Sequence, residues 1–453
     1  MKAIIMSGGS GSKISPYHRF WQKSCLPIGN EPNILRIINQ LKSAGIEDIA
    51  VVVDYMEEQV RYVTRKCGDI EIIKAQTGKI AETLESICEG QEDILVYYGD
   101  IYLHDNDFSA FLKSYREKGN TVLLKNLDEK YKGTDYICAD YKDDKVKQFY
   151  GHPRGNYGNA KVGGCFAING EISSYFKYNP NIFLNVCVGQ MPPHEFFLEQ
   201  ILNTAIEDGI VFHGVFTRHN YVDIDFPWDI MIANQYCCED ECIKLTKNVI
   251  GEGATISEKA ELRGFIKIGK NSVIGDRVVI EGNCIIGDNT VIDNGAIIGA
   301  NSIIGNNTFV KDYCKLSANT VIGNHNRIGF TSEITGVTFD HVSATHQCEV
   351  YGVVGRQTDI AAGCIMGILR FDDLETEIKA PVKKYSGKYT NGIFLGDYMR
   401  TGIGNLFAPG VRVGSNSCLG PGLVVNKDVP ENKMLLVKQE VIEIDWSSER
   451  YGW

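Results

Sequence analysis

A glycine- and serine-rich segment near the start of the chain carries the residues best suited to hold phosphate groups. The segment Ser7-Gly8-Gly9-Ser10-Gly11-Ser12 has little side-chain bulk, so its backbone N–H groups can approach an anion closely. Lys13 follows at once, and Lys23 lies ten residues further on. A small-residue loop followed by two spaced lysines predicts a cradle for a triphosphate.

Two better-known phosphate-binding loops do not fit this segment. The P-loop needs a glycine followed directly by Lys and then by Ser or Thr, whereas Lys13 lies between Ser12 and Ile14. The dinucleotide fingerprint needs a glycine three residues after Gly11, where Ile14 stands. An ordinary turn between a strand and a helix, with surface lysines, remains the non-functional alternative.

The segment resembles the signature of sugar-1-phosphate nucleotidylyltransferases, G-x-G-[TS]-R, then a spacer, then P-K-x-x-x-P. Gly9 to Lys13 match with Lys in the Arg place, and Gln22 to Pro27 match with Gln in the first Pro place. The resemblance implies transfer of a nucleotidyl group from a nucleoside triphosphate to a sugar-1-phosphate, with Lys13 and Lys23 as catalytic residues. It implies nucleotide contacts from Ser7, Gly8, Gly9, Ser10, Gly11 and Ser12.

Two aspartate segments fit the same family. Asp100 follows Gly99 and an apolar run, as does the aspartate that binds Mg²⁺ in these enzymes. The segment 221–230, YVDIDFPWDI, resembles W-x-D-[VI]-G-x-P-W-D-L, which makes Asp223 the expected second metal ligand. Asp225 stands where the family pattern has Gly, and its carboxylate could either bind the metal or interfere with metal binding. Mg²⁺ prefers one or two carboxylates with phosphate oxygens and water, although each aspartate alone fits a turn or cap equally well.

The segments that would contact the sugar and the base match the family pattern less closely. Val162 to Phe166 resembles the segment N-[AG]-G-[IF]-[YF] that passes under the sugar, and the family's E-K-P tripeptide reads Gly-His-Pro here. A Gln and a Gly fall near the family's base-binding segment, with a shorter spacing. The implied sugar-binding residues are Gly164, His152 and Glu195, and the implied base-binding residues are Gln76 and Gly78. The alternatives without a binding role are a strand bulge at Gly164 and a surface turn at Gly78.

An alternating series of strands and helices is expected to position these residues. Apolar runs at residues 3–6, 49–53, 94–98 and 121–124 predict buried strands, and residues 34–45 have helical spacing. The alternation indicates an α/β domain with a Rossmann-like, mostly parallel sheet covered on both faces. Because ligands lie at the carboxyl ends of such strands, the glycine-rich segment and Asp100 should share one rim of the sheet.

A second domain is indicated by a hexapeptide period. Aliphatic residues recur at every sixth position from Ile250 to Ile328, and Gly often follows. This period is typical of a left-handed parallel β-helix, whose coils stack to bury one aliphatic residue per side. The predicted domains are 1–235 (catalytic), 236–249 (connector helix), 250–435 (β-helix, with a long loop at about 338–394) and 436–453 (tail).

The β-helix raises a second candidate activity. In the bifunctional, archaeal-type members that the chain resembles, a His acts as base for acyl transfer from acetyl-CoA. His346 lies near the expected position, with His341 as a rival, and Ala362 to Asp372 resembles the A-G-T-x-x-A-N-L-R-F-D of these members. Ile368 stands in the Asn place, however. A third reading is a non-catalytic scaffold, against which the retained Lys23, Asp100 and Asp223 argue.

Composition and charge exclude several other classes of protein. At 453 residues the chain is too long for one typical core, and 43% hydrophobic with 23% charged residues is ordinary for a globular protein. A net charge of -11 argues against nucleic-acid binding, and no apolar run has membrane-spanning length. The 14 scattered cysteines, with no signal peptide expected, predict reduced thiols in a cytoplasm. The family resemblance implies a homotrimer.

Overall fold

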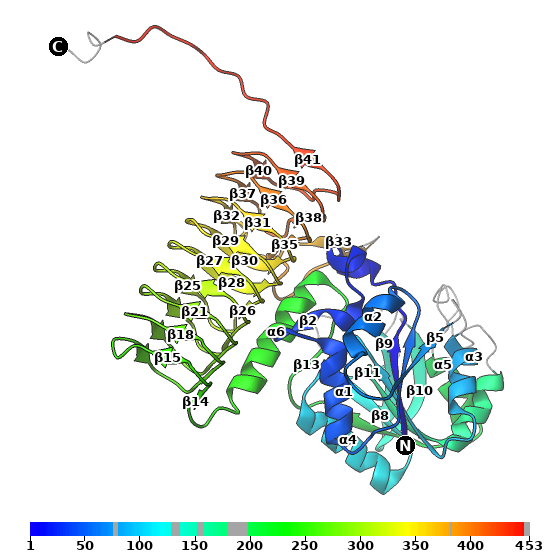
Figure 1. Ribbon diagram of the computed structural model, residues 1–453. Helices are drawn as coiled ribbons and strands as arrows, with labels where there is room; N and C mark the ends of the chain where they lie inside the picture. Colours follow the sequence, from blue (N-terminus) through cyan, green and yellow to red (C-terminus); the bar gives the residue numbers. More distant parts are fainter. Residues whose placement is uncertain (76–79, 128–135, 152–157, 179–197, 381–382, 448–453) are drawn as a thin grey trace.

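The computed structural model describes residues 1–75, 80–127, 136–151, 158–178, 198–380 and 383–447. An α/β domain and a parallel β-helix lie side by side, and one long helix, α6 (Pro227–Cys242), runs between them (Figure 1). Within the described residues, no helix has the length and apolar character needed to cross a bilayer.

The sheet of the α/β domain contains the four predicted strands. Its order is β5-β4-β1-β6-β11-β8-β12-β10-β9, and β5, β4, β1 and β6 are mutually parallel. The strands are β1 (Lys2–Ser7), β4 (Ile49–Val53), β5 (Ile70–Lys74), β6 (Asp93–Tyr98), β8 (Thr121–Asn126), β9 (Ile137–Lys142), β10 (Lys145–Gly151), β11 (Ala160–Asn169) and β12 (Phe212–Phe216).

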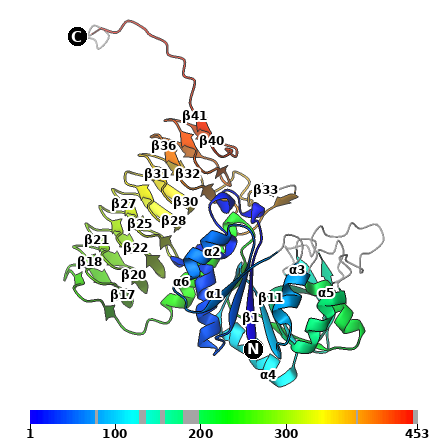
Figure 2. The ribbon, with the colours of Figure 1, turned by 45° about the vertical axis from the view of Figure 1, so that its right-hand side comes forward.

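Helices cover both faces of this sheet because the strand side chains alternate between two apolar clusters. Ala3 and Ile5 pack with α1 and α4, whereas Ile4 packs with α3 and α5 on the other face. Figure 2 shows β1 and β11 between these two groups of helices. The helices are α1 (Asn33–Ser43), α2 (Glu57–Thr64), α3 (Ile80–Cys88), α4 (Asp105–Lys118) and α5 (Leu198–Glu207).

The sheet is less uniformly parallel than the strand pattern suggests. Strand β11 lies between β6 and β8 and is antiparallel to both. The pairing of Cys165 with Tyr97 therefore brings the beginning of β11, not its end, to the rim where β6 ends. A second small sheet pairs β7 (Ile101–Leu103) with β13 (Tyr221–Asp223) in antiparallel register.

The connector helix begins earlier than predicted. Helix α6 starts at Pro227, inside the range assigned to the catalytic domain, rather than at 236. Asp229 caps its first turn by accepting hydrogen bonds from the backbone N–H groups of Asp225 and Phe226, at 3.0 and 2.7 Å. Proline at the first position of a helix is favourable because its missing N–H would have no partner there. The helix thus starts directly after the aspartate segment.

The β-helix confirms the hexapeptide prediction in its first half. Its early coils are 18 residues long, as the pairing of Val249 with Lys267 and of Ile285 with Ile303 shows. From Ile268 to Ile328 the aliphatic residues at every sixth position are buried in one continuous core, Ile256 and Leu262 are partly buried against it, and Ile250 is exposed. The strands are β14 (Val249–Ile250), β15 (Thr255–Ile256), β16 (Glu261–Leu262), β17 (Ile266–Ile268), β18 (Val273–Ile274), β19 (Val279–Ile280), β20 (Cys284–Ile286), β21 (Val291–Ile292), β22 (Ile297–Ile298), β23 (Ser302–Ile304), β24 (Phe309–Val310), β25 (Lys315–Leu316), β26 (Val321–Ile322) and β27 (Arg327–Ile328).

The prediction of a long loop from about 338 was wrong. The coils continue through residue 366, but they are 16 residues long, since Glu333 pairs with Glu349 and Ser343 with Asp359. The insertion is confined to the residues between β32 and β35. The remaining strands are β28 (Glu333–Thr338), β29 (Ser343–Ala344), β30 (Glu349–Val354), β31 (Asp359–Ile360), β32 (Ile365–Met366), β33 (Ile378–Ala380), β34 (Lys383–Tyr385), β35 (Ile393–Leu395), β36 (Arg400–Thr401), β37 (Leu406–Phe407), β38 (Arg412–Val413), β39 (Cys418–Leu419), β40 (Val424–Val425) and β41 (Met434–Leu435).

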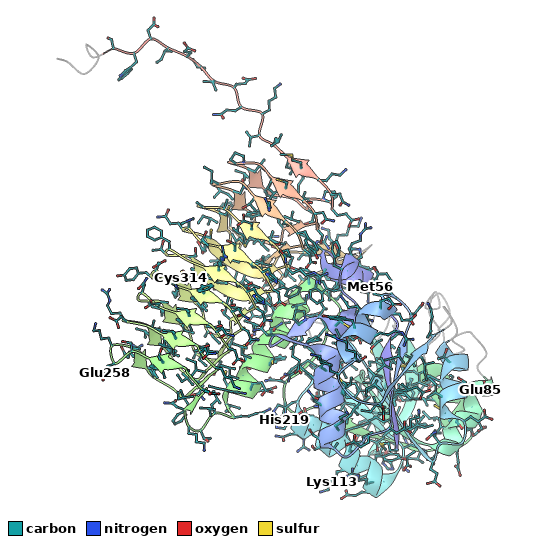
Figure 3. The ribbon with its side chains drawn as sticks, viewed as in Figure 1. Met56, Glu85, Lys113, His219, Glu258 and Cys314 are labelled. Carbon is teal, nitrogen blue, oxygen red and sulfur yellow. The ribbon has the colours of Figure 1, made fainter. Side chains whose placement is uncertain are left out.

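The spacer between the two signature lysines packs on the β-helix. It contains the short 3₁₀ helix η2 (Tyr17–Arg19), and the two lysines themselves lie in η1 (Ser12–Ile14) and η3 (Lys23–Cys25). The Tyr17 hydroxyl donates to the Val353 carbonyl at 2.8 Å, and the Trp21 indole N–H donates to Asp397 Oδ1 at 3.0 Å. Side chains fill the space between the domains (Figure 3), and one apolar cluster includes residues of both.

Candidate active site

The glycine-rich loop leaves the end of β1 and borders a cleft at the rim of the sheet. Gly9 to Ser12 line this cleft together with Lys13 and Lys23. Gly11 has a φ of +63°, and a Cβ there would lie 3.1 Å from Lys23 Cγ. A side chain at this position would therefore be strained and would crowd the lysine. Ser7 is buried, and Gly8 packs near Asp54, so neither borders the cleft.

Gln22 explains how the loop is held without the proline of the family pattern. Its Nε2 donates to the Ser7 carbonyl, and its Oε1 accepts from the Ser24 backbone N–H. The side chain is 2% exposed. One buried amide therefore ties the loop that follows β1 to the turn that carries Lys23.

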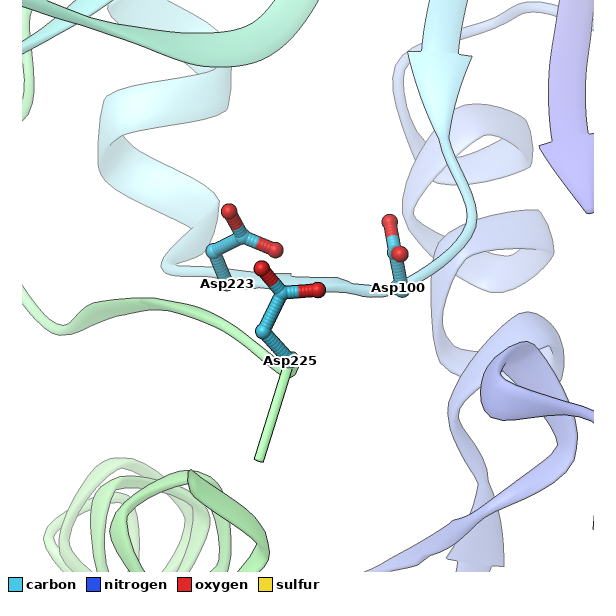
Figure 4. A group of neighbouring side chains, drawn as sticks. All are labelled: Asp100, Asp223 and Asp225. Atoms are coloured by element: carbon cyan, nitrogen blue, oxygen red, sulfur yellow. The ribbon is translucent and has the colours of Figure 1, made fainter. Parts of the chain in front are cut away.

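Three carboxylates meet on the far side of this cleft. Oxygens of Asp100, Asp223 and Asp225 all lie within 4.8 Å of one another (Figure 4). Strand pairing brings them together, because Asp223 is opposite Ile101 and the Ile224 N–H donates to the Asp100 carbonyl at 2.8 Å. The geometry unites both predicted metal ligands and adds Asp225 to them.

Lysines neutralise these carboxylates directly. Lys23 Nζ lies 2.8 Å from Asp100 Oδ2 and 2.6 Å from Asp225 Oδ1, and Lys13 Nζ lies 3.3 Å from Asp225 Oδ2. Burial disfavours the charged amine of Lys23, but the Asp100 and Asp225 carboxylates outweigh burial and raise its pKa well above the ordinary value. Burial likewise opposes ionisation of Asp225, but Lys23 and Lys13 lower its pKa below the ordinary value. Both groups are therefore charged at neutral pH.

Lys161 is a site residue that the sequence analysis missed. Its Nζ lies 3.1 Å from Asp223 Oδ2 and 3.8 Å from the centroid of the Tyr136 ring, and its side chain is 12% exposed. The sequence pattern predicted site residues only at the carboxyl ends of parallel strands, whereas Lys161 lies at the beginning of β11, which is antiparallel to its neighbours. Three lysines and three aspartates thus balance their charges at one rim.

The cleft extends along β11 to a fourth carboxyl group, that of Glu199. It has a volume of about 280 Å³ and includes Gly164, Tyr98 and Glu199 in its lining. Gly164 has a φ of +76°, and a Cβ there would lie 3.2 Å from Tyr98 Cβ. The predicted residues Gln76, Gly78, His152 and Glu195 lie outside the described residues.

An adjoining cleft of about 470 Å³ lies between the aspartates and the β-helix insertion. The Tyr385 ring lies 4.5 Å from the Phe226 ring, centroid to centroid, and Lys13 Nζ lies 5.7 Å from the Phe226 centroid. The Lys388 ammonium and the Tyr389 hydroxyl both donate to Gln235 Oε1 on α6. The β-helix therefore forms part of the surroundings of the signature lysines.

Comparison with known proteins identifies the family of the chain. The nucleotidyl transferase family matches residues 2–236, which hold the loop, the lysines and the aspartates. The chain belongs to the nucleotidyl transferase family. The GMPPB C-terminal domain matches residues 244–339 of this nucleotidyl transferase, within the β-helix.

Relatives of this nucleotidyl transferase extend over both domains. A Methanococcus maripaludis (strain C7) protein named bifunctional protein GlmU is 30% identical over 450 residues, or 98% of each chain. A Sulfurisphaera tokodaii protein named bifunctional sugar-1-phosphate nucleotidylyltransferase/acetyltransferase is 26% identical over 95% of this chain and 98% of its own. The solved inositol-1-phosphate CTP transferase of T. maritima covers 52% of this chain and 95% of its own, with 14% identity and a TM-score of 0.43.

The predicted acyl-transfer base of this nucleotidyl transferase lies on the surface of a coil. The His346 side chain is exposed, and within the described residues its ring makes no hydrogen bond or ion pair. The rival His341 is also exposed and stacks on His325 at 4.6 Å between ring centroids. Neither histidine is close to the cleft that holds the aspartates, which lies in the other domain.

Proposed function

We propose that the chain transfers a nucleotidyl group from a nucleoside triphosphate to a sugar-1-phosphate, with Mg²⁺, and produces a nucleotide sugar and pyrophosphate. The observation that supports this most strongly is the convergence of Lys13, Lys23 and the three aspartates on the cleft that the glycine-rich loop borders. These groups are distant in the sequence. If these side chains served only to stabilise the fold, they would not need to share one cleft with the glycine-rich loop.

The residues of the site suit a reaction between two phosphates. An oxygen of the sugar phosphate attacks the α-phosphorus of the triphosphate, and the bond from that phosphorus to the leaving pyrophosphate breaks. Such a transfer needs alignment and charge stabilisation more than covalent help from the protein. The N–H groups of Gly9 to Ser12 would hold phosphate oxygens, Lys13 would neutralise the leaving pyrophosphate, and Lys23 would hold the α-phosphate against the incoming sugar phosphate.

The aspartates fit the proposed metal ion. All three offer carboxylate oxygens within 4.8 Å of one another, and hard oxygen donors are the ligands that Mg²⁺ prefers. When bound, Mg²⁺ would neutralise negative charge on the phosphate oxygens. Asp100 and Asp223 would hold it, and Asp225 would complete the set or remain with the lysines.

The ion pairs suggest how the site changes when the substrate binds. In this structure, Lys13 and Lys23 pair with Asp225 and Asp100. A triphosphate carries more negative charge than one carboxylate, so its oxygens would compete for the lysines and leave the aspartates to the metal. The lysines would therefore exchange carboxylate partners for phosphate partners rather than lose hydrogen bonds.

A substrate panel tests the proposed activity. Nucleoside triphosphates are combined with several sugar-1-phosphates, with and without Mg²⁺, and pyrophosphate release is measured. We expect release for at least one pair, loss with EDTA, and a fall of about a thousandfold or more in Asp100→Asn. Mg²⁺–triphosphate binding without release from any pair would contradict the proposal and favour a non-catalytic scaffold.

Acetyl transfer by the β-helix is a second candidate, which the printed name of the Sulfurisphaera tokodaii relative favours. An open apolar groove of about 600 Å³, lined by residues that include Leu369 and Phe371, lies beside β37 and β40 of the β-helix. Thiol release from acetyl-CoA with glucosamine-1-phosphate would test it. Release that disappears in His346→Ala would support acyl transfer, and no release from the wild type would contradict it.

We further propose that the chain is a homotrimer, as in the family that it resembles. Ile365, Leu406 and Val424 stand in register on successive coils, and their side chains are exposed. Contiguous exposed aliphatic side chains are typical of surfaces that pack against a partner. Light scattering of the full chain should give three times the monomer mass of 50.4 kDa, and a monomer would contradict this proposal.

A further inference from the structure

A buried carboxyl group at the β11 end of the cleft has an incomplete set of partners. Glu199, in the first turn of α5, is 0% exposed. Its Oε1 accepts from the Tyr98 hydroxyl at 2.8 Å, but its Oε2 has no hydrogen-bond donor within the described part of the chain. Glu199 also lines the cleft. Buried polar atoms almost always have a partner, and no described residue donates to this oxygen, so a bound substrate is a candidate for its partner.

The position of Glu199 indicates which substrate would supply that partner. Along the sheet, the glycine-rich loop follows β1, Asp100 follows β6, and Gly164 lies on the next strand, β11. The phosphate groups are therefore expected over β1 and β6, and the acceptor over β11. Tyr98 joins these two parts, because it ends β6 and donates to Glu199.

We propose that Glu199 is a specificity-determining residue that binds a ring hydroxyl of the sugar through its second carboxyl oxygen. The inference rests on the proposed function and extends it by naming the class of acceptor, a neutral sugar with a hydroxyl at this position. Gly164 packs closely against Tyr98 and lines the same cleft as Glu199, so the cleft that would receive the sugar ring reaches this carboxyl group.

The electrostatics of the group agree with a neutral partner. Burial raises the pKa of Glu199 to about 7, and the hydrogen bonds from its own backbone N–H and from Tyr98 oppose this only in part. A carboxyl group that is partly protonated near neutral pH can both accept from and donate to a hydroxyl. A carboxylate or phosphate substituent on the sugar would bring a second negative charge into a buried place, so such sugars should be rejected.

The sequence contained a weaker indication of this residue. The family pattern pointed to Glu195, which is four residues, or about one helical turn, before Glu199. Only the packing of α5 against the sheet shows that Glu199 is buried at the cleft and faces Tyr98.

Two sets of measurements test the inference in the full-length chain. Glu199→Gln is compared with Glu207→Gln, an exposed glutamate at the other end of the same helix. Pyrophosphate release gives kcat and KM for both substrates between pH 6 and 8. The wild type is also assayed with singly deoxygenated analogues of the best sugar-1-phosphate.

We expect one deoxygenated analogue to lose about tenfold or more in kcat/KM with the wild type, because one hydrogen bond to a buried group is lost. Glu199→Gln should show a similar loss for the parent sugar and little further loss with that analogue. Its KM for the triphosphate should stay within about twofold, and the pH dependence of its sugar KM should flatten. Glu207→Gln should match the wild type.

Three outcomes would overturn the inference. Equal kcat/KM for all deoxygenated analogues with an active wild type would exclude a hydroxyl contact even if Glu199→Gln did not fold. An unchanged kcat/KM for the parent sugar phosphate in a folded Glu199→Gln would also refute it, while the nucleotidyl-transfer activity stands. Absence of turnover with every sugar phosphate would instead reject the proposed function and this inference together.

Discussion

Asp397 provides a quantitative test of how the two domains are joined. Its side chain is 0% exposed at the contact between the β-helix and the lysine spacer. Oδ1 accepts from the Trp21 indole at 3.0 Å and from the Arg356 backbone N–H at 3.0 Å. Oδ2 has no hydrogen bond among the described residues. In Asp397→Asn, the amide oxygen can keep both acceptor contacts while the negative charge is removed.

The expected change follows from the pKa of this carboxyl group. Burial raises the pKa of Asp397 from 3.8 to about 6, with the Trp21 and Arg356 contacts opposing. Folded Asp397 therefore favours the neutral acid, and its contribution to stability is fully present below about pH 4 and is lost as the pH rises through about 6. The pKa of Asp397 is raised by about two units, which corresponds to about 3 kcal/mol in the free energy of unfolding. About half of this stabilisation is lost above pH 5.

Urea unfolding of the wild type and Asp397→Asn, followed by tryptophan fluorescence from pH 5 to 8, measures this effect. Other titrating groups are shared by both proteins, so they cancel in the difference between the two free energies of unfolding. We expect that difference to move by about 1.5 kcal/mol in favour of Asn between pH 5 and 8. Asp373→Asn, an exposed turn aspartate, serves as the control and should show no such trend.

Parallel stability profiles for the wild type and Asp397→Asn would show that Asp397 is ionised in the folded state without cost. A difference that grows toward acid would mean that its contacts favour the carboxylate. Either result would refute the reasoning that burial dominates at this contact, and would indicate that Arg356, which lies 3.7 Å from Oδ1, compensates the charge.

Three further predictions concern the cleft and its support. Asp225→Gly should raise the Mg²⁺ concentration for half-maximal pyrophosphate release about tenfold, because one carboxylate is lost; an unchanged value would limit Asp225 to holding the lysines. Lys161→Met should lower kcat/KM for the sugar phosphate about tenfold or more, since its charge faces Asp223 and the cleft; full activity would remove Lys161 from the site. Tyr17→Phe should lower the free energy of unfolding by about 1–3 kcal/mol, because the buried Val353 carbonyl loses its donor, and an unaltered melting temperature would contradict this.

The sequence was most informative where local pattern alone decides structure. The apolar runs predicted the positions of β1, β4, β6 and β8, and the hexapeptide period predicted the coils, because each strand buries side chains at a fixed spacing. The period failed beyond Ile334 because the step to the next buried position at Thr338 is four residues rather than six, although stacking continues.

The site was predictable only in part for a related reason. Lys13, Lys23, Asp100 and Asp223 belong to patterns that can be read along the chain. Lys161 and Glu199 do not, because their positions depend on the reversed direction of β11 and on the packing of α5. Which predicted ligands share a cleft is a property of strand pairing, such as that of Asp223 with Ile101.

The contact of Tyr17 and Trp21 with the coils has a consequence for any attempt to divide the protein. Cutting the chain after α6 would strip the mixed apolar cluster of its coil residues and leave Phe226 and Trp228 facing water. The segment that spaces the two signature lysines would lose its anchor at the same time. We therefore expect the amino-terminal half not to fold as a separate module, and we expect substitutions in the coils to change how firmly the segment between Lys13 and Lys23 is held.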